Sequence, residues 1–123
     1  MKILILGAAG RAARSAIHSL VSMGGIEHFY LADHNAEALS KLTADLASLP
    51  VSPRFIDAES EKSLRERMRE ADLAIGCLGP FHRYEGNVVR AAVAARCDYL
   101  SLCDDPEASE EAHSHDKDAR RVG

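Results

Sequence analysis

The stretch "GAAGRAAR", at residues 7–14, has the composition of a segment that binds phosphate. It directly follows the apolar run "KILIL", so that a strand would pass through a turn of small residues into a helix. The first N–H groups of a helix have no partner within it, and they lie at the positive end of the helix dipole. A pyrophosphate can accept hydrogen bonds from such groups. We therefore expect the N–H groups at this turn to be free and to point toward an anion.

Two phosphate-loop spacings fit this turn. Gly7, Ala9 and Ala12 match G-x-G-x-x-G/A, with alanine in the middle position. Gly7, Gly10 and Ala13 match the related spacing G-x-x-G-x-x-G/A. We favour the second spacing, because it keeps glycine where a Cβ atom would collide with the phosphate. Without a ligand, the same small residues would only allow the helix to pack closely on the sheet.

Charged residues near the turn would complete a dinucleotide site. Arg11 can contact a phosphate oxygen, and Asp33 ends the apolar run "FYLAD" about twenty residues past the turn. A carboxylate there accepts hydrogen bonds from the hydroxyls of an adenosine ribose, or it only caps a helix. It also repels a 2′-phosphate, and His34 and Asn35 follow it rather than an arginine. We therefore expect NAD rather than NADP, unless Lys41 or a protonated His34 supplies the cation.

Two further segments would border the cofactor. Asp57 ends the run "PRFID" and would either accept from the adenine amine or serve as a turn residue. The loop "CLGPFHRYEGN" follows another strand and would face the first turn, beside the nicotinamide. The residues expected along this half of the cofactor are Leu78, Gly79, Pro80 and Phe81, with His82, Arg83 and Tyr84 as a polar rim. We assign no catalytic residue.

The elements that would position these residues alternate regularly. Apolar runs predict strands at residues 2–6, 28–33, 53–57, 72–78 and 98–103. Between them, apolar residues recur at steps of three and four, which is typical of helices. A single helix is expected after Asp105-Pro106. This alternation predicts an α/β fold: a doubly wound parallel sheet (Rossmann) of order 3-2-1-4-5 with helices on both faces.

Size and composition limit the alternatives. The 123 residues suffice for one domain, and the net charge of −4 argues against nucleic acid and anionic membranes as partners. The first apolar run is too short for a signal peptide, so we expect a cytoplasmic protein. Three cysteines without close pairing fit reduced thiols, and we expect no metal site.

The whole chain resembles the N-terminal NAD(P)-binding domain of saccharopine dehydrogenase-like oxidoreductases. The resemblance lies in "GAAGRAAR", "LADHNAEALSKL" and, most specifically, "DLAIGCLGPFHRYEGNVVRAAVAARCDYLSLCDD". It implies hydride transfer with NAD or NADP at a small amino-acid-derived C–N substrate such as saccharopine or carboxyspermidine. By position it implies a phosphate loop of Gly7, Gly10, Arg11 and Ala12, ribose contacts at Asp33 and His34, an adenine contact at Asp57, and a nicotinamide half along residues 78–81.

The same resemblance implies that residues 1–123 are the first domain of a longer enzyme. The family's second domain carries most substrate contacts and the sheet of a homodimer, so this domain alone should bind a dinucleotide without turnover. Two other functions are consistent with the residues. One is a non-catalytic NAD(H)-sensing regulatory module, because the same fold also serves regulators. The other is a domain whose site has decayed, since alanines occupy fingerprint positions.

Overall fold

The computed structural model describes all residues from 1 to 123, and its centre is a parallel sheet of five strands. The strands are β1 (Lys2–Leu6), β2 (His28–Asp33), β3 (Val51–Phe55), β4 (Leu73–Gly76) and β5 (Asp98–Ser101). They lie in the order β3-β2-β1-β4-β5, and every neighbouring pair is parallel. The predicted Rossmann-like sheet is therefore confirmed.

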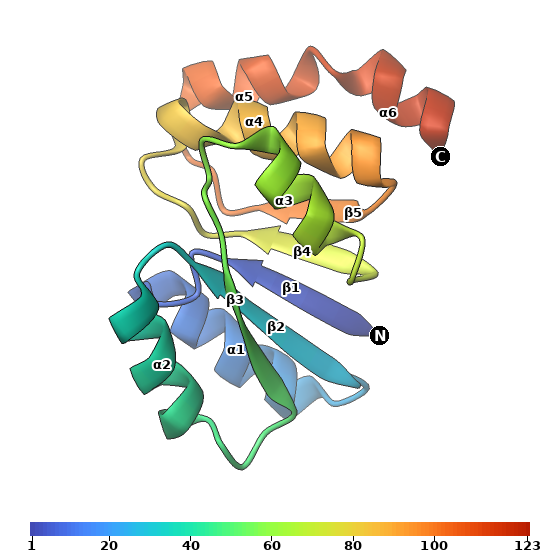
Figure 1. Ribbon diagram of the computed structural model, residues 1–123. Helices are drawn as coiled ribbons and strands as arrows, with labels where there is room; N and C mark the ends of the chain where they lie inside the picture. Colours follow the sequence, from blue (N-terminus) through green and yellow to red (C-terminus); the bar gives the residue numbers. More distant parts are fainter.

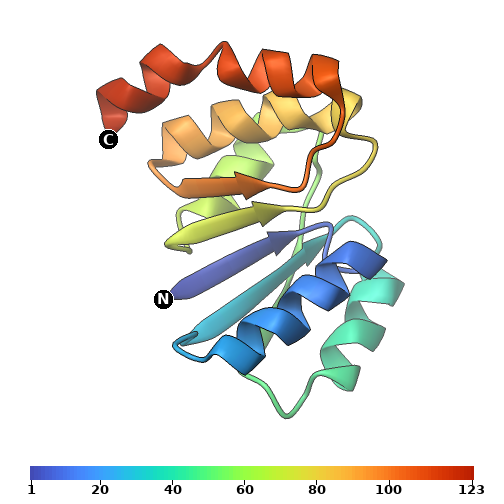
Figure 2. The ribbon, with the colours of Figure 1, turned by 180° about the vertical axis from the view of Figure 1, so that it is seen from behind.

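Helices cover both faces of this sheet. They are α1 (Arg11–Met23), α2 (Ala36–Asp45), α3 (Glu61–Met68), α4 (Phe81–Ala95), α5 (Pro106–His113) and α6 (Asp116–Val122). Figure 1 shows α1 and α2 on one face and α3 and α4 on the other. In the view from behind, α5 and α6 lie on the outer side of α4 (Figure 2). Because all neighbouring strands are parallel, their carboxyl ends share one edge of the sheet, where the crossovers into the helices begin.

The central strand β1 separates two apolar layers. Ile3 and Ile5 belong to the layer formed with α1 and α2, whereas Leu4 and Leu6 belong to the layer formed with α3 and α4. These four side chains are at most 1% exposed. A strand covered on both faces needs an apolar residue at every position, which is why "KILIL" is continuous rather than alternating.

The helix ends follow the local signals in the sequence. The side chains of Asn35, Ser60 and Asp105 each accept a hydrogen bond from the N–H group three residues later. They begin α2, α3 and α5, respectively. Gly24, with a φ of 74°, ends α1. These caps fix where each crossover enters and leaves its helix.

The third strand lies two residues earlier than the sequence predicted. The N–H group of Phe29 donates to the carbonyl of Pro50 at 2.8 Å, so pairing with β2 begins there rather than at Pro53. Pro53 is tolerated inside β3 because the strand lies at the edge of the sheet, where a missing N–H group breaks no pairing. The strands predicted at 72–78 and 98–103 end earlier, and their last residues belong to loops.

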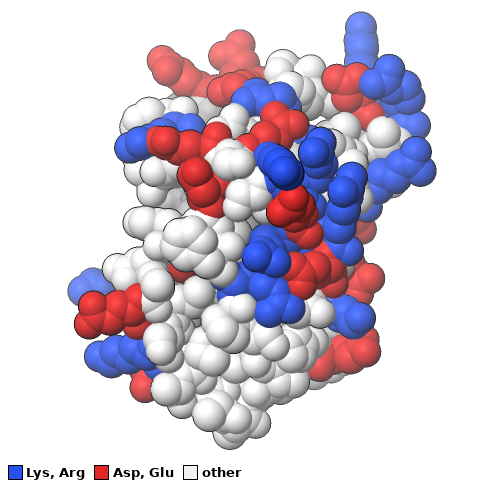
Figure 3. All heavy atoms as spheres, viewed as in Figure 1, with Lys and Arg blue, Asp and Glu red and all other residues white.

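The helix predicted after Pro106 is two helices, α5 and α6. The hydroxyl of Ser114 donates to the carbonyl of Glu111 at 2.6 Å and ends α5. α6 buries no residue, so no apolar face holds the two segments in line. None of the helices combines the length and apolar composition needed to cross a membrane. On the face shown in Figure 3, Lys and Arg are interspersed with Asp and Glu over α3 to α6.

Candidate functional site

The turn between β1 and α1 lies against the crossover that follows β4. Gly7 has a φ of +77°, in the left-handed region. A Cβ atom here would lie 2.7 Å from the carbonyl oxygen of Cys77, a backbone atom that no side-chain rotation can move aside. Glycine is therefore required for both the conformation and the close approach. The first turn and the loop after β4 meet at this point, as the sequence predicted for the two loops.

The N–H groups of the turn fall into two sets. Those of Gly7 and Ala8 donate to the carbonyl of Ala32 at 2.9 and 3.0 Å. That of Gly10 donates to the carbonyl of Gly7 at 3.1 Å. The expectation of free N–H groups is wrong for these three residues, because Gly7 and Ala8 hold the turn against β2 and Gly10 closes the turn itself. The N–H groups of residues 11–13, in the first turn of α1, have no acceptor in the protein and remain available to an anion.

The small residues of this turn differ in their burial. Ala13 is 0% exposed and belongs to the apolar layer between α1 and the sheet. Ala9 and Ala12 are exposed at the surface of the turn. Gly10 is the N-cap of α1, and Arg11 is its first residue. Arg11 is exposed and takes part in no ion pair in the structure, so its guanidinium is free to contact an anion at the same helix end.

The carboxylate of Asp33 ties this turn to the end of β2. One oxygen accepts the N–H group of Ala9 at 3.1 Å, and the other accepts that of Asn35 at 3.0 Å. The residue is only 6% exposed. It does not cap α2, because Asn35 has that role. A carboxylate oxygen can accept a second hydrogen bond, and Oδ1 also lies 3.4 Å from Nδ1 of His34. The carboxylate in addition stabilises the turn, which the sequence pattern did not indicate.

Four of the predicted site residues line one pocket at the carboxyl ends of β2, β3 and β4. The pocket has a volume of about 190 Å³, and these four residues are His34, Asp57, Leu78 and Gly79. Arg83 and Tyr84, which were expected only as a polar rim, also line it, together with the unassigned Ala58 and Glu59. No sequence signal pointed to Ala58 or Glu59, because their place depends on how the loop after β3 folds.

Asp57 is at once a turn residue and a pocket residue. Its carboxylate accepts the N–H group of Glu59 at 3.0 Å, and its own N–H group donates to the hydroxyl of Ser63 at 3.1 Å. These two bonds hold the loop after β3 in shape at the start of α3. The two interpretations of this residue from the sequence are therefore compatible.

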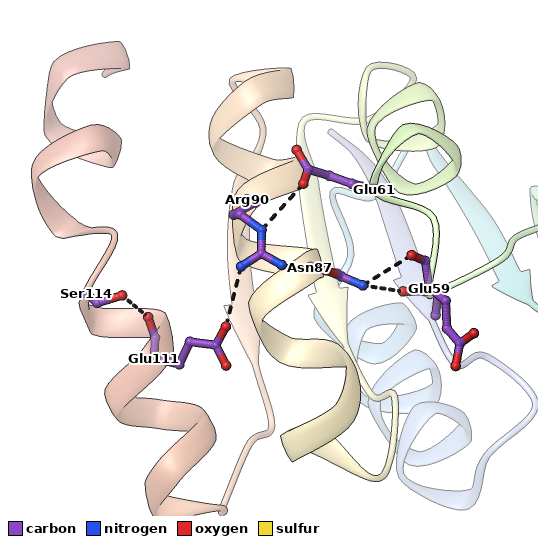
Figure 4. Close-up of polar contacts among 7 residues, drawn as sticks. Glu59, Glu61, Asn87, Arg90, Glu111 and Ser114 are labelled. Atoms are coloured by element: carbon purple, nitrogen blue, oxygen red, sulfur yellow. Dashed lines mark hydrogen bonds and ion pairs between the residues drawn. The ribbon is translucent and has the colours of Figure 1, made fainter.

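The loop of Asp57 is also attached to α4. The amide nitrogen of Asn87 donates to the carbonyls of Ala58 and Glu59 at 3.4 and 3.3 Å (Figure 4). The oxygen of the same amide accepts from Arg90 at 2.5 Å. Arg90 in turn pairs with carboxylates on α3 and α5, so that three helices are linked through one side chain (Figure 4).

The remaining predicted residues, at the start of α4, lie outside this pocket. Pro80 is the N-cap of α4, and the peptide bond between Gly79 and Pro80 is cis. Phe81 is partly buried as the first residue of α4, and His82 is exposed. The pocket lining includes none of the three residues Pro80, Phe81 and His82. Gly7 meets this crossover at Cys77 and Leu78. Leu78 and Gly79, which were expected along the nicotinamide half, line the pocket together with His34 and Asp57.

A second polar group lies between α4 and β5. The hydroxyl of Tyr99 donates to Glu85, which is 3% exposed, at 2.9 Å. Burial raises the pKa of the Tyr99 phenol, so it remains a donor. A Cβ atom at Gly76 would overlap this hydroxyl, which explains a glycine inside β4. Sequence reasoning missed this pair.

The cysteines and the acidic groups form no metal centre. Cys97 is buried, Cys77 and Cys103 are partly buried, and all three are free thiols. Burial raises the pKa of the Cys77 thiol. No group of three or more His, Cys, Asp or Glu side chains is placed to hold a metal ion.

A doubly wound parallel sheet with a tight glycine turn at its first crossover, free helix N–H groups and a pocket at the carboxyl edge defines a dinucleotide-binding Rossmann domain. The sequence model of the family described as saccharopine dehydrogenase NADP binding domain matches residues 3–122. The chain belongs to this family, and the predicted resemblance is confirmed.

Individual relatives agree with this assignment. A probable mitochondrial saccharopine dehydrogenase-like oxidoreductase of Arabidopsis thaliana is 28% identical over 94% of the chain. A saccharopine dehydrogenase-like oxidoreductase of Mus musculus is 29% identical over 69% of the chain. The chain spans 28% and 20% of the lengths of these two relatives. The apo saccharopine dehydrogenase (L-Glu forming) of Saccharomyces cerevisiae has the same fold, with a TM-score of 0.68 and 19% identity over 89% of this chain and 23% of that one.

Proposed function

We propose that this domain binds a nicotinamide dinucleotide and orients it for hydride transfer at a C–N bond of a small amino-acid-derived substrate. The single observation that carries the proposal is the set of free N–H groups at residues 11–13, beside the exposed Arg11. A pyrophosphate bound there would satisfy these donors and meet the positive end of the helix dipole. The hydride chemistry belongs to the nicotinamide, so the task of the domain is binding and orientation.

A pyrophosphate at the start of α1 would set the direction of the two halves of the cofactor. The adenosine would extend over the end of β2 into the pocket of His34, Asp57 and Leu78. The nicotinamide would extend in the other direction, past Gly7 toward Pro80 and Phe81, which lie outside this pocket. We further propose that a second domain supplies the substrate contacts, which the greater length of the relatives supports. The 123-residue chain alone should therefore bind the dinucleotide without oxidising or reducing a substrate.

The test is a calorimetric titration of NADP+ and NAD+ into the wild-type chain and the Ala12→Glu variant. Ala12 is exposed in the first turn of α1 and its N–H group is free. A carboxylate in this turn stabilises the helix, by about 0.3–1 kcal/mol, yet it repels a pyrophosphate. We expect both dinucleotides to bind at least about 10-fold more weakly to the variant, the equivalent of about 1.4 kcal/mol.

The matched control is Ser48→Glu, which adds the same charge at an exposed turn beyond the far end of α2. It should bind like the wild type. The proposal fails if the wild-type chain binds neither dinucleotide, or if Ala12→Glu binds both as tightly as the control does. Loss of binding through unfolding is excluded when the variant has an unfolding midpoint no lower than that of the wild type.

A further inference from the structure

Two basic side chains from distant parts of the sequence border the same pocket. His34 follows β2, and its side chain is 79% exposed. Arg83 lies in the first turn of α4, and its side chain is 58% exposed. A dinucleotide bound as proposed places its adenosine ribose at the end of β2, beside His34. This pocket would receive the adenosine, and Arg83 is the one arginine among the residues that line it.

The present partner of Arg83 holds it weakly. The guanidinium pairs with the carboxylate of Glu59, whose side chain is 57% exposed. An ion pair between two exposed side chains contributes little, because both groups are also well solvated apart. A phosphate monoester carries more charge than a carboxylate and can accept two parallel N–H bonds from a guanidinium. A phosphate in the pocket can therefore displace Glu59, which would return to solvent.

The backbone around this pair is fixed independently of the pair itself. Asn87 lies one turn after Arg83 on the same face of α4. Its bonds to the carbonyls of Ala58 and Glu59 hold the loop after β3 against the helix (Figure 4). Exchange of Glu59 for another anion would leave these bonds intact. The backbone of Arg83 therefore stays at the edge of the pocket whichever anion the guanidinium pairs with.

We propose that Arg83 is the residue that recognises the ribose 2′-phosphate of NADP, with His34 as a second donor and Glu59 as a competing carboxylate. This inference rests on the proposed function. The sequence favoured NAD because no arginine follows Asp33. Arg83 supplies that cation from α4 instead, against the opposing charge of Asp33, whose Oδ1 atom lies 3.4 Å from Nδ1 of His34. The domain therefore prefers NADP.

The test measures dissociation constants of NADP+ and NAD+ for the wild-type chain, Arg83→Gln and Glu59→Gln. Loss of a charged hydrogen-bond partner should weaken NADP+ binding to Arg83→Gln about 10- to 100-fold. Removal of the competing carboxylate should strengthen NADP+ binding to Glu59→Gln about 2- to 5-fold. NAD+ lacks the 2′-phosphate, so its dissociation constant should change less than about 2-fold in both variants.

Arg120→Gln is the matched control, because it removes the same charge from an exposed ion pair on α6. It should leave both dissociation constants unchanged. Equal weakening of NADP+ and NAD+ by Arg83→Gln would overturn the inference, because Arg83 would then contact a part common to both. An unchanged NADP+ affinity in Arg83→Gln, with the wild type binding both dinucleotides, would overturn it while the proposed function stands. Binding of neither dinucleotide to the wild type would overturn both.

Discussion

Replacement of Gly7 by alanine tests whether the two crossovers meet as rigid backbones. The added Cβ atom would lie 2.7 Å from the oxygen and 2.9 Å from the carbon of the Cys77 carbonyl. Real Cβ atoms do not approach backbone this closely, so the turn or the end of β4 must shift. Gly79 in the same crossover offers the matched control, because a Cβ atom there would meet nothing within 4 Å.

The expected cost has two parts. A left-handed conformation costs an L-residue about 1–2 kcal/mol. Forcing an extra carbon into a packed site costs about 1–3 kcal/mol more. Gly7→Ala should therefore lower the free energy of unfolding by about 2–5 kcal/mol, a large share of the roughly 5–15 kcal/mol of a typical domain.

Urea denaturation, followed by circular dichroism, measures this change. With a slope of about 2 kcal/mol per molar urea, the midpoint for Gly7→Ala should fall by about 1–2.5 M. Gly79→Ala should have nearly the wild-type midpoint. If the two variants unfold at the same urea concentration, the contact between Gly7 and Cys77 is not rigid, and glycine is not required there for close approach.

Three further predictions concern stability. Tyr99→Phe removes the donor to the buried Glu85 and should lower the free energy of unfolding by about 1–3 kcal/mol, measured with urea. Burial, with repulsion from nearby carboxylates, raises the pKa of Cys97 from 9.0 to about 11. The folded state then holds the thiol proton more tightly than the unfolded state does. The contribution of Cys97 to the free energy of unfolding should therefore be fully present below pH 9.0 and decline as the pH rises toward about 11. Urea midpoints of the wild type and Cys97→Ala across this range test it, because the variant should lack this component. Asn35→Ala removes the cap that accepts from Ala38 and should cost about 1 kcal/mol, whereas Asn35→Asp should retain most of the stability.

Most of the fold was predictable because its signals are local. The continuous apolar run at residues 2–6 identifies a strand covered on both faces. Asn35 and Asp105 mark helix starts because their side chains bond to N–H groups three residues away. Right-handed crossovers then leave few ways to order five parallel strands. Gly7, Gly10 and Ala13 likewise lie within a single strand–turn–helix unit, so their spacing could be recognised from the sequence.

The contacts between different crossovers were decided only by the tertiary structure. Asp33 binds the N–H group of Ala9, and Arg83 shares a pocket with His34, although neither pair is close in sequence. Such pairs depend on how far each loop extends past its strand and how α4 packs on the sheet. No local pattern of residue types encodes those distances. The sequence alone thus determined the type of fold and the glycine turn at its first crossover, whereas the packing of the crossovers determined which charged side chains meet at the carboxyl edge of the sheet.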